Sequence, residues 1–484
     1  MLPRRAMLRK AGFSAAAAVG GTALAACASR SGGALPGSAH AVLMVPFALW
    51  VVAIPINRET TALIQHFVDS SFNAGHKGIR AVWQPQPDLA TLAATITAGG
   101  ESPVVVAGCC ADWPLFQPFA KDLEAELRQR NVNFNLWSPA ALAAGRIGGT
   151  GALQRLPANS AIEAYLYRQD ILDELGLTYP APDWTYQDAS RLWQACTGSK
   201  GGKHRYGTTV PWQSAGVPEG LPAVLQGFGG AYTSSDGTHC LLEAPESIQC
   251  GEYFFDLVWS GVGTTGDGSP NPGIFDGSLV FTQGAVPTIL QAVQRLGSGT
   301  KWDFVGYPRW PVRPATILHD AFYAINAFAP RQDLAWEILD FVAIGTQWQE
   351  FSTRLTLSPP PQLPLLSQWV AALRSIAPIL QTKSLQYWVD PSLRGEAYPQ
   401  YEFFRYAPVQ ANTLVGSLWP RLWNRQVGVS EGFRTLAQEI DALEAAGAQQ
   451  PPPLTGAQRI AQVQAERRRF PTRGSGIATV PLGR

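Results

Sequence analysis

Apolar positions along the chain follow two alternating patterns, one of short continuous runs and one of longer stretches with apolar residues three or four positions apart. The three valines at 104–106 predict a buried strand that ends at Gly108. Residues 41–55 predict an extended segment, and residues 60–72 predict a helix. The apolar face of that helix comprises Leu63, Ile64, Phe67 and Val68. This alternation predicts an α/β protein with parallel strands.

Two later helices carry equally clear signals. Thr185 and Asp188 are spaced as a capping box, in which each side chain accepts a hydrogen bond from the other residue's backbone N–H. The apolar stripe of that helix comprises Leu192, Trp193 and Cys196. The same spacing recurs in a second helix at Leu334, Ile338 and Phe341. Each helix is therefore expected to pack one face on a core.

The first 27 residues have the pattern of an export signal. Basic residues between positions 4 and 10 precede the uncharged segment Ala11–Ala26, which is too short to span about 30 Å of hydrocarbon as a helix. The paired arginines resemble a twin-arginine signal, and the sequence Leu-Ala-Ala-Cys resembles a bacterial lipobox with Cys27 as the lipidated residue. The alternative is an uncleaved apolar helix with an incidental cysteine. Lipidation predicts an extracytoplasmic protein anchored to the cell membrane, with residues 28–40 as a flexible tether.

Composition limits the kind of protein that remains. About 450 residues follow the signal, enough for two lobes with separate cores. A net charge of +1 argues against a nucleic-acid partner, and 46% hydrophobic with 15% charged residues indicates a globular chain. The 16 Trp, 13 Tyr and 21 Phe exceed what a core needs, so several are expected to line a cavity.

The cysteines give no metal site. Five lie beyond Cys27, an odd number that excludes a fully paired disulfide framework. Cys240 and Cys250 are spaced for a small disulfide loop in an oxidising compartment, and two buried free thiols are the equal alternative. Adjacent Cys109 and Cys110 lack a nearby histidine, so no zinc site is expected.

Enzyme motifs are absent from the sequence, which contains no HExxH, GxSxG or P-loop pattern. Residues 261–266 match GxGxxG, but this stretch follows a predicted helix and not a strand, so a dinucleotide site is rejected. We therefore expect no enzyme activity, no metal and no cofactor.

Seven segments, in the right order from about Ala41 to about Ala446, resemble family 1 extracellular solute-binding proteins. Among them, IEAYLYRQDILDELGL and PAPDWTYQDASRLWQAC resemble one strand and the start of the following helix in that family. GFGGAYTSSDGTHC, IFDGSLVFTQGAVPTIL, WDFVGYP and ATILHDAFYAINAFAP resemble its later strands and turns.

That resemblance implies a type II periplasmic-binding-protein fold, with two hinged α/β lobes, each built on a parallel sheet, and a ligand cleft between them. On this analogy one lobe comprises residues 41–155 and 316–346, and the other comprises residues 156–315 and 347–447. Residues 448–484 form a Pro-rich, basic tail. The implied function is a monomeric ABC-importer subunit that binds a carbohydrate or polyol and delivers it to membrane permeases. A secreted carbohydrate-active hydrolase and a non-transporting surface lipoprotein are the alternatives.

The resemblance also suggests ligand-binding residues on the cleft loops. They are Arg58, Asp112, Trp113, Trp212, Gln213, His319, Asp320 and Tyr401. Each has a plain alternative: Asp112 as a helix cap, Arg58 as a solvated arginine, and Trp212 and Tyr401 as core residues. His319 and Asp320 replace the family's glycine-rich loop, and residues 283–288 lack the stacking Trp of many relatives. The expected ligand is therefore smaller or more polar than a long oligosaccharide.

Overall fold

The computed structural model describes residues 43–49 (backbone only), 57–85, 89–97, 103–108, 113–211, 219–265, 271–319, 321–329 and 331–449. The signal segment, the tether and the tail beyond residue 449 lie outside these residues. So do Cys27, Cys109, Cys110, Asp112, Trp212, Gln213 and Asp320. Within the described residues, no helix combines the length and apolar character needed to span a bilayer.

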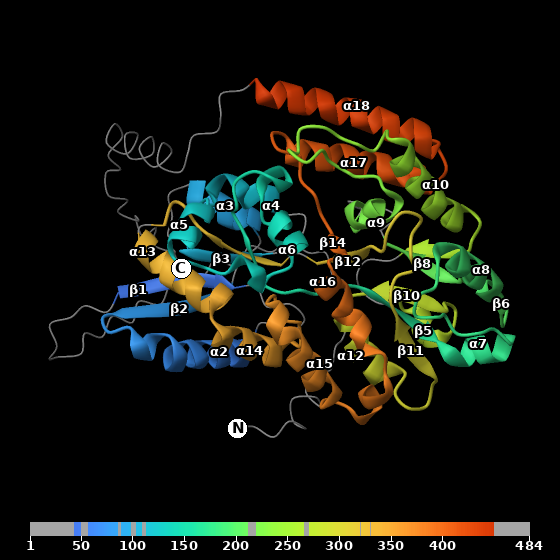
Figure 1. Cartoon of the computed structure of the whole chain (residues 1–484), viewed down its shortest axis with the longest axis horizontal. Coiled ribbons are helices and arrows are strands. Elements are labelled where there is room, and N and C mark those ends of the chain that lie inside the picture. The colour runs from blue at the N-terminus through green and yellow to red at the C-terminus, as the bar shows by residue number, and fades with distance from the viewer. Residues whose placement is uncertain are drawn as a thin grey trace, which may run out of the picture. The chain divides into compact units, whose positions relative to one another are not determined.

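The described strands and helices are shown in Figure 1. The strands are β1 (Leu43–Leu49), β2 (Ile79–Pro85), β3 (Val105–Gly108), β4 (Leu156–Pro157), β5 (Ala164–Arg168), β6 (Gly198–Lys200), β7 (Lys203–Arg205), β8 (Thr208–Val210), β9 (Gly263–Thr265), β10 (Phe281–Gly284), β11 (Trp302–Val305), β12 (Thr316–Leu318), β13 (Phe322–Ile325) and β14 (Ala397–Pro399). The α-helices are α2 (Arg58–Ser71), α3 (Leu89–Thr97), α4 (Trp113–Phe116), α5 (Glu124–Gln129), α6 (Pro139–Ala144), α7 (Gln169–Leu175), α8 (Tyr186–Cys196), α9 (Leu221–Phe228), α10 (Pro245–Trp259), α11 (Gly273–Asp276), α12 (Pro287–Arg295), α13 (Gln332–Leu339), α14 (Thr346–Thr356), α15 (Leu366–Arg374), α16 (Asp390–Arg394), α17 (Pro408–Trp423) and α18 (Val429–Ala448). Short 3₁₀ turns are η1 (Asn73–Gly75), η3 (Gln117–Phe119), η4 (Phe134–Leu136), η5 (Ile147–Gly149), η7 (Leu363–Leu365), η8 (Pro378–Thr382) and η9 (Leu385–Trp388), and a π-helical turn is η6 (Asp340–Ile344).

Helix α2 begins where Asn57 caps it, because the Asn57 side chain accepts a hydrogen bond of 2.9 Å from the Thr60 backbone N–H. Ile64 and Val68 are fully buried, as predicted. Leu63, which the sequence placed on the same face, is 38% exposed. Consecutive residues of a helix point about 100° apart, so Leu63 turns away from a contact centred on its neighbour Ile64.

The capping box at the start of α8 is present as predicted. The Thr185 hydroxyl accepts from the Asp188 N–H at 3.2 Å, and the Asp188 carboxylate accepts from the Thr185 N–H at 2.9 Å. Trp193 and Cys196 on this helix are completely buried. The box satisfies two N–H groups that a helix start otherwise leaves without partners.

The larger sheet has the strand order β2-β1-β3-β13-β4. β1 is parallel to β2 and β3, whereas β13 is antiparallel to β3 and β4. Val105 and Val106 of β3 are completely buried, which confirms the predicted buried strand. Side chains alternate between the two faces, so Val106 and Phe322 pack with α3 and α4 while Val105 and Tyr323 pack with α2, α13 and α14. Figure 1 shows α2 and α14 on the opposite side of this sheet from α3 and α4.

Both sheets correct the prediction of a parallel sheet in each lobe. In the larger sheet β13 is antiparallel to β3 and β4, and the second sheet departs further. Its order is β10-β5-β11, and both neighbours run antiparallel to β5. Chain direction explains the difference. β5 leaves the junction with the first sheet after β4, whereas β11 brings the chain back towards β12 and β13. An outgoing and a returning strand that lie side by side must be antiparallel.

The buried side chains form separate clusters on the two sides of the segments that link the sheets. Two clusters cover the faces of the larger sheet. Two others surround the second sheet, one with α8, α9, α10, α17 and α18 and one with α12 and α15. A small cluster of Ala141, Ile162, Leu318 and Ala397 lies where the linking segments meet. Separate cores joined by crossing segments give the two-lobed α/β fold.

Candidate binding site at the crossing segments

Three segments far apart in the sequence lie side by side where the chain passes between the sheets. The His319 N–H donates to the Ala161 carbonyl at 2.7 Å, and the Ala158 N–H donates to the Ala321 carbonyl at 2.8 Å. β12 pairs in parallel with β14, and the Gln400 N–H donates to the Leu318 carbonyl at 2.8 Å. We call these three strips, residues 157–163, 316–322 and 397–403, the crossing segments.

A buried carboxylate holds two crossing segments together. Glu163 is 3% exposed, and its two oxygens accept separate hydrogen bonds, from the Tyr307 hydroxyl at 2.7 Å and with the His319 Nε2 at 2.8 Å. Burial raises the pKa of Tyr307 well above its ordinary value, so the phenol stays a donor. Since the His319 side chain is still 19% exposed, it connects this buried network with the surface of the junction.

Arg155 lies beside this network and is only 3% exposed. Its guanidinium carbon lies 4.7 Å from the ring centre of Trp113, 5.1 Å from that of Phe322 and 5.7 Å from that of Phe403. The guanidinium also donates to the Ala144 carbonyl. A cation among three aromatic rings is attracted by their negative faces, which keeps this charge at the junction.

Arg155, Asn159, His319 and Phe322 line a small pocket at the junction. Its volume among described residues is about 10 Å³, which is room for one water molecule. The loops that contain Asp112, Trp212 and Asp320 lie outside the described residues. The pocket therefore shows which polar groups the described residues bring together at the junction: a guanidinium, an amide and an imidazole.

Tyr401 on the third crossing segment is buried and joins this segment to the second lobe. Its hydroxyl donates to the Glu219 carboxylate, and its ring stacks on Phe403 with centres 6.0 Å apart. Nearby, the Glu402 carboxylate accepts from the Thr233 N–H at 3.2 Å. Burial raises the pKa of Glu402. Both carboxylates thus accept hydrogen bonds within the protein and tie the third crossing segment to the second lobe.

The sequence-predicted site residues separate into three groups. His319, Trp113 and Tyr401 lie at or beside the crossing segments, with Trp113 buried edge-on against Phe322 at 4.8 Å between ring centres. Arg58 is the exposed first residue of α2, and in the described part of the chain it has no hydrogen bond or ion pair. The others, Asp112, Trp212, Gln213 and Asp320, lie outside the described residues.

Cys240 and Cys250 are free thiols in the structure, so the disulfide considered for them is not formed. Both are buried in the largest core cluster. Cys250 lies within α10, whereas Cys240 lies in an extended bridge with Thr233 before that helix. Each thiol packs among apolar side chains. The alternative of two buried free thiols is therefore the one that the structure shows.

Sequence reasoning missed Glu163, Arg155, Glu219 and Tyr307. The available signal was polarity in an apolar context, because Glu163 stands between Ile162 and Ala164 in a run of buried residues. Lys, Glu, Arg and Asp are seldom fully buried unless paired, so a charged residue inside a predicted strand indicates a partner. Nothing in the sequence identifies that partner.

No group of three or more His, Cys, Asp or Glu side chains in the described residues is arranged to hold a metal ion. The junction instead offers hydrogen-bond donors, acceptors and aromatic rings. Such a lining suits a solute that is held by hydrogen bonds and ring contacts.

Solved structures with the same fold come from several bacteria. The cyclic α-maltosyl-1,6-maltose binding protein of Arthrobacter globiformis has a TM-score of 0.66 and 16% identity, over 84% of this chain and 100% of that one. An ABC substrate-binding protein of Listeria monocytogenes in complex with cycloalternan has a TM-score of 0.63 and 14% identity, over 83% and 98%. A sugar transporter protein of Rhizobium etli in an open conformation has a TM-score of 0.64 and 16% identity, over 83% and 100%. At these identities the likeness shows the two-lobed fold. A search of curated protein sequences finds no significant match.

The family model for bacterial extracellular solute-binding proteins matches residues 56–343, more than half of the chain. The match begins just before α2, passes through all the strands of the second sheet and ends in η6. It therefore includes the first two crossing segments and the Glu163 network. The chain belongs to the family of bacterial extracellular solute-binding proteins.

Proposed function

We propose that this chain is the binding subunit of an ABC importer and takes a carbohydrate or related polyol between its two lobes. The observation that carries the proposal is the group of Arg155, Asn159, His319 and Glu163 at the crossing segments, beside Trp113 and Phe403. Sugars pack their CH-bearing faces on apolar rings and need charged or amide groups for their hydroxyls. Two of the solved structures with this fold are named for bound cyclic saccharides.

The proposed binding residues come from both lobes. They are Arg58, Asp112, Trp113, Trp212, Gln213, His319, Asp320 and Tyr401, with Arg155, Glu163 and Glu219 added from the junction. One proposed lobe comprises residues 41–155 and 316–346, the other residues 156–315 and 347–447. Because the chain crosses between them repeatedly, closure is a rotation about the crossing segments. The ligand favours the closed form by its difference in affinity for the two forms.

The remaining steps are also proposals. Lipidation at Cys27 anchors the protein outside the cytoplasm, residues 28–40 give it reach, and the closed monomer delivers its solute to membrane permeases. The protein makes and breaks no covalent bond in its solute. Retaining the solute intact separates this role from that of a secreted hydrolase.

A thermal-shift titration with mono-, di- and trisaccharides tests the proposal, with amino acids as control solutes. A solute that binds the folded state adds RT ln(1 + [L]/Kd), about 2.7 kcal/mol at a hundredfold excess over Kd. We expect stabilisation by one saccharide class, and chromatography should recover that saccharide unchanged. Stabilisation by no saccharide, or its consumption, would contradict the proposal.

A further inference from the structure

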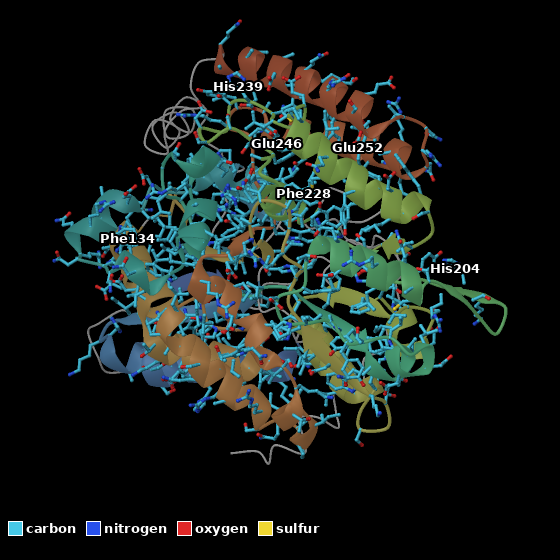
Figure 2. All side chains as sticks on the ribbon, turned by 45° about the vertical axis from the view of Figure 1, so that its right-hand side comes forward. Phe134, His204, Phe228, His239, Glu246 and Glu252 are labelled. Carbon is cyan, nitrogen blue, oxygen red and sulfur yellow. The ribbon has the colours of Figure 1, made fainter. Side chains whose placement is uncertain are left out.

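A second cavity lies on the second lobe. It is a groove of about 410 Å³ between α8, α10 and the turn that joins α17 to α18. The lining includes Gln194 of α8, Tyr253, Asp256 and Trp259 of α10, and Arg425 of the turn. It shares no lining residue with the pocket at the crossing segments. Figure 2 labels Glu246 and Glu252, which lie on α10.

Three polar groups in the groove are available to a ligand. Within the described residues, no hydrogen bond or ion pair engages the Gln194 amide, the Asp256 carboxylate or the Arg425 guanidinium. All three residues are exposed. The Ser190 hydroxyl donates to the Tyr186 carbonyl at 2.9 Å and lies 3.0 Å from the Tyr253 hydroxyl, so both hydroxyls have partners in the wall. The groove thus offers an acceptor, a donor and an amide that is both.

Arg425 is held in place at an energetic cost. Its backbone has φ +57°, the left-handed region that favours glycine, and its N–H donates to the Leu422 carbonyl at 2.9 Å. The guanidinium lies 5.1 Å from the ring centre of Trp259, whose indole N–H also donates to Leu422, at 3.1 Å. A left-handed residue other than glycine is rare and is a reason to look for a function.

Charge balance in the groove selects the kind of ligand. Asp256 and Arg425 carry opposite charges, so the groove offers no net charge to attract a free anion or cation. Hydroxyl groups both donate and accept, and a ligand with neighbouring hydroxyls can therefore satisfy the carboxylate, the guanidinium and the amide together. The apolar wall of Leu257 and the edge of Trp259 suits the CH groups of a sugar ring.

We propose that this groove is a second saccharide site, independent of the site between the lobes. It binds a neutral mono- or disaccharide weakly in the groove on the second lobe. Asp256 accepts from one hydroxyl, Arg425 donates to another, and Gln194 contacts a third. Such a site can hold a saccharide near the protein whatever the interlobe site has bound.

Saturation-transfer NMR of the full-length protein with D-glucose, D-mannose and maltose at millimolar concentration tests this proposal. We expect signals with at least one sugar, and affinity about tenfold weaker in the double variant Asp256→Ala/Arg425→Gly. The matched control Glu252→Ala/Arg421→Ala removes one negative and one positive charge from exposed positions on α10 and near the end of α17, and should bind as the wild type. Arg425→Gly also relieves the left-handed backbone, so the single variant should unfold at a higher temperature while it binds sugar less well.

Two results would overturn the proposal: no signal from any of the three sugars, or equal signals from the wild type and the Asp256→Ala/Arg425→Gly variant. The double variant and its matched control both keep the residues of the interlobe site, so signal common to the two comes from that site and the difference between them comes from the groove. The two proposals can therefore fail separately.

Discussion

Glu163 and His319 are 156 residues apart in the chain, and the Glu163 carboxylate meets the His319 Nε2 at 2.8 Å. The same carboxylate accepts from Tyr307, so one buried group connects the strand that leaves the first lobe with the segment that returns to it. In the closure proposed above, the lobes rotate about segments that this bond connects. The proposed solute site and the proposed pivot therefore share neighbouring residues.

Glu163→Ala should destabilise the protein by about 2 kcal/mol or more, because it leaves the Tyr307 hydroxyl and the His319 ring without their buried partner. Urea unfolding measures the change. Glu252→Ala, an exposed glutamate on α10, is the matched control and should stay within about 0.5 kcal/mol of the wild type. Equal stability of the two variants would show that the buried carboxylate is not what joins the crossing segments.

Gly148→Ala should cost more stability than Gly176→Ala, although both glycines have positive φ, +54° and +66°. A Cβ at 148 would lie 2.3 Å from the Asp236 carbonyl oxygen, whereas a Cβ at 176 meets nothing within 4 Å. The second variant therefore measures backbone strain alone, and the first adds a clash. We expect a difference of about 1–3 kcal/mol in the free energy of unfolding. Equal free energies of unfolding for the two variants would mean that the segment around Gly148 can move away from the Asp236 carbonyl without loss of stability.

The described cysteines should resist thiol reagents while the protein is folded. Burial raises the pKa of Cys196 and of Cys240 to about 12, and it raises the pKa of Cys250 well above its ordinary value. Since the thiolate is the reacting form, maleimide at neutral pH should modify none of the three before denaturation and all three after it. Mass spectrometry of the labelled peptides gives each residue separately. Detection of a peptide pair linked by a Cys240–Cys250 disulfide would contradict the free thiols of the structure.

Glu124 should contribute to loss of stability in acid. Hydrogen bonds from Arg146 and Arg128, both at 2.6 Å, lower its pKa from 4.5 to about 2. Because the folded pKa is the lower one, its contribution is fully present above the unfolded value and is lost as pH falls from about 4.5 towards 2. Unfolding free energies at several pH values in that window should therefore fall less steeply for Glu124→Gln than for the wild type. Parallel curves would contradict the assigned ion pairs.

The sequence predicted local features well because their causes are local. Thr185 and Asp188 are three residues apart, and the buried valines of β3 are consecutive. The prediction for the apolar face of α2 was only partly right, because Leu63 is exposed. Which apolar residues of a helix are buried depends on the elements that pack against it. Strand direction in the second sheet was wrong, because apolar runs do not record whether a strand leaves or returns.

The site was harder to predict than the fold. His319, Trp113 and Tyr401 were found by resemblance to family loops and do lie at or beside the crossing segments. Glu163 and Arg155 were missed because each depends on partners from distant segments, Tyr307 and His319 for one and Phe322 and Phe403 for the other. A single sequence contains no record of such pairs.

Small-angle X-ray scattering with and without a saturating saccharide tests the central claim most directly. If the lobes close on a solute, the radius of gyration should decrease with the saccharide that stabilises the protein in the thermal-shift titration, and it should not change with a saccharide that does not. Binding of a stabilising saccharide with no change in the radius of gyration would contradict closure about the crossing segments.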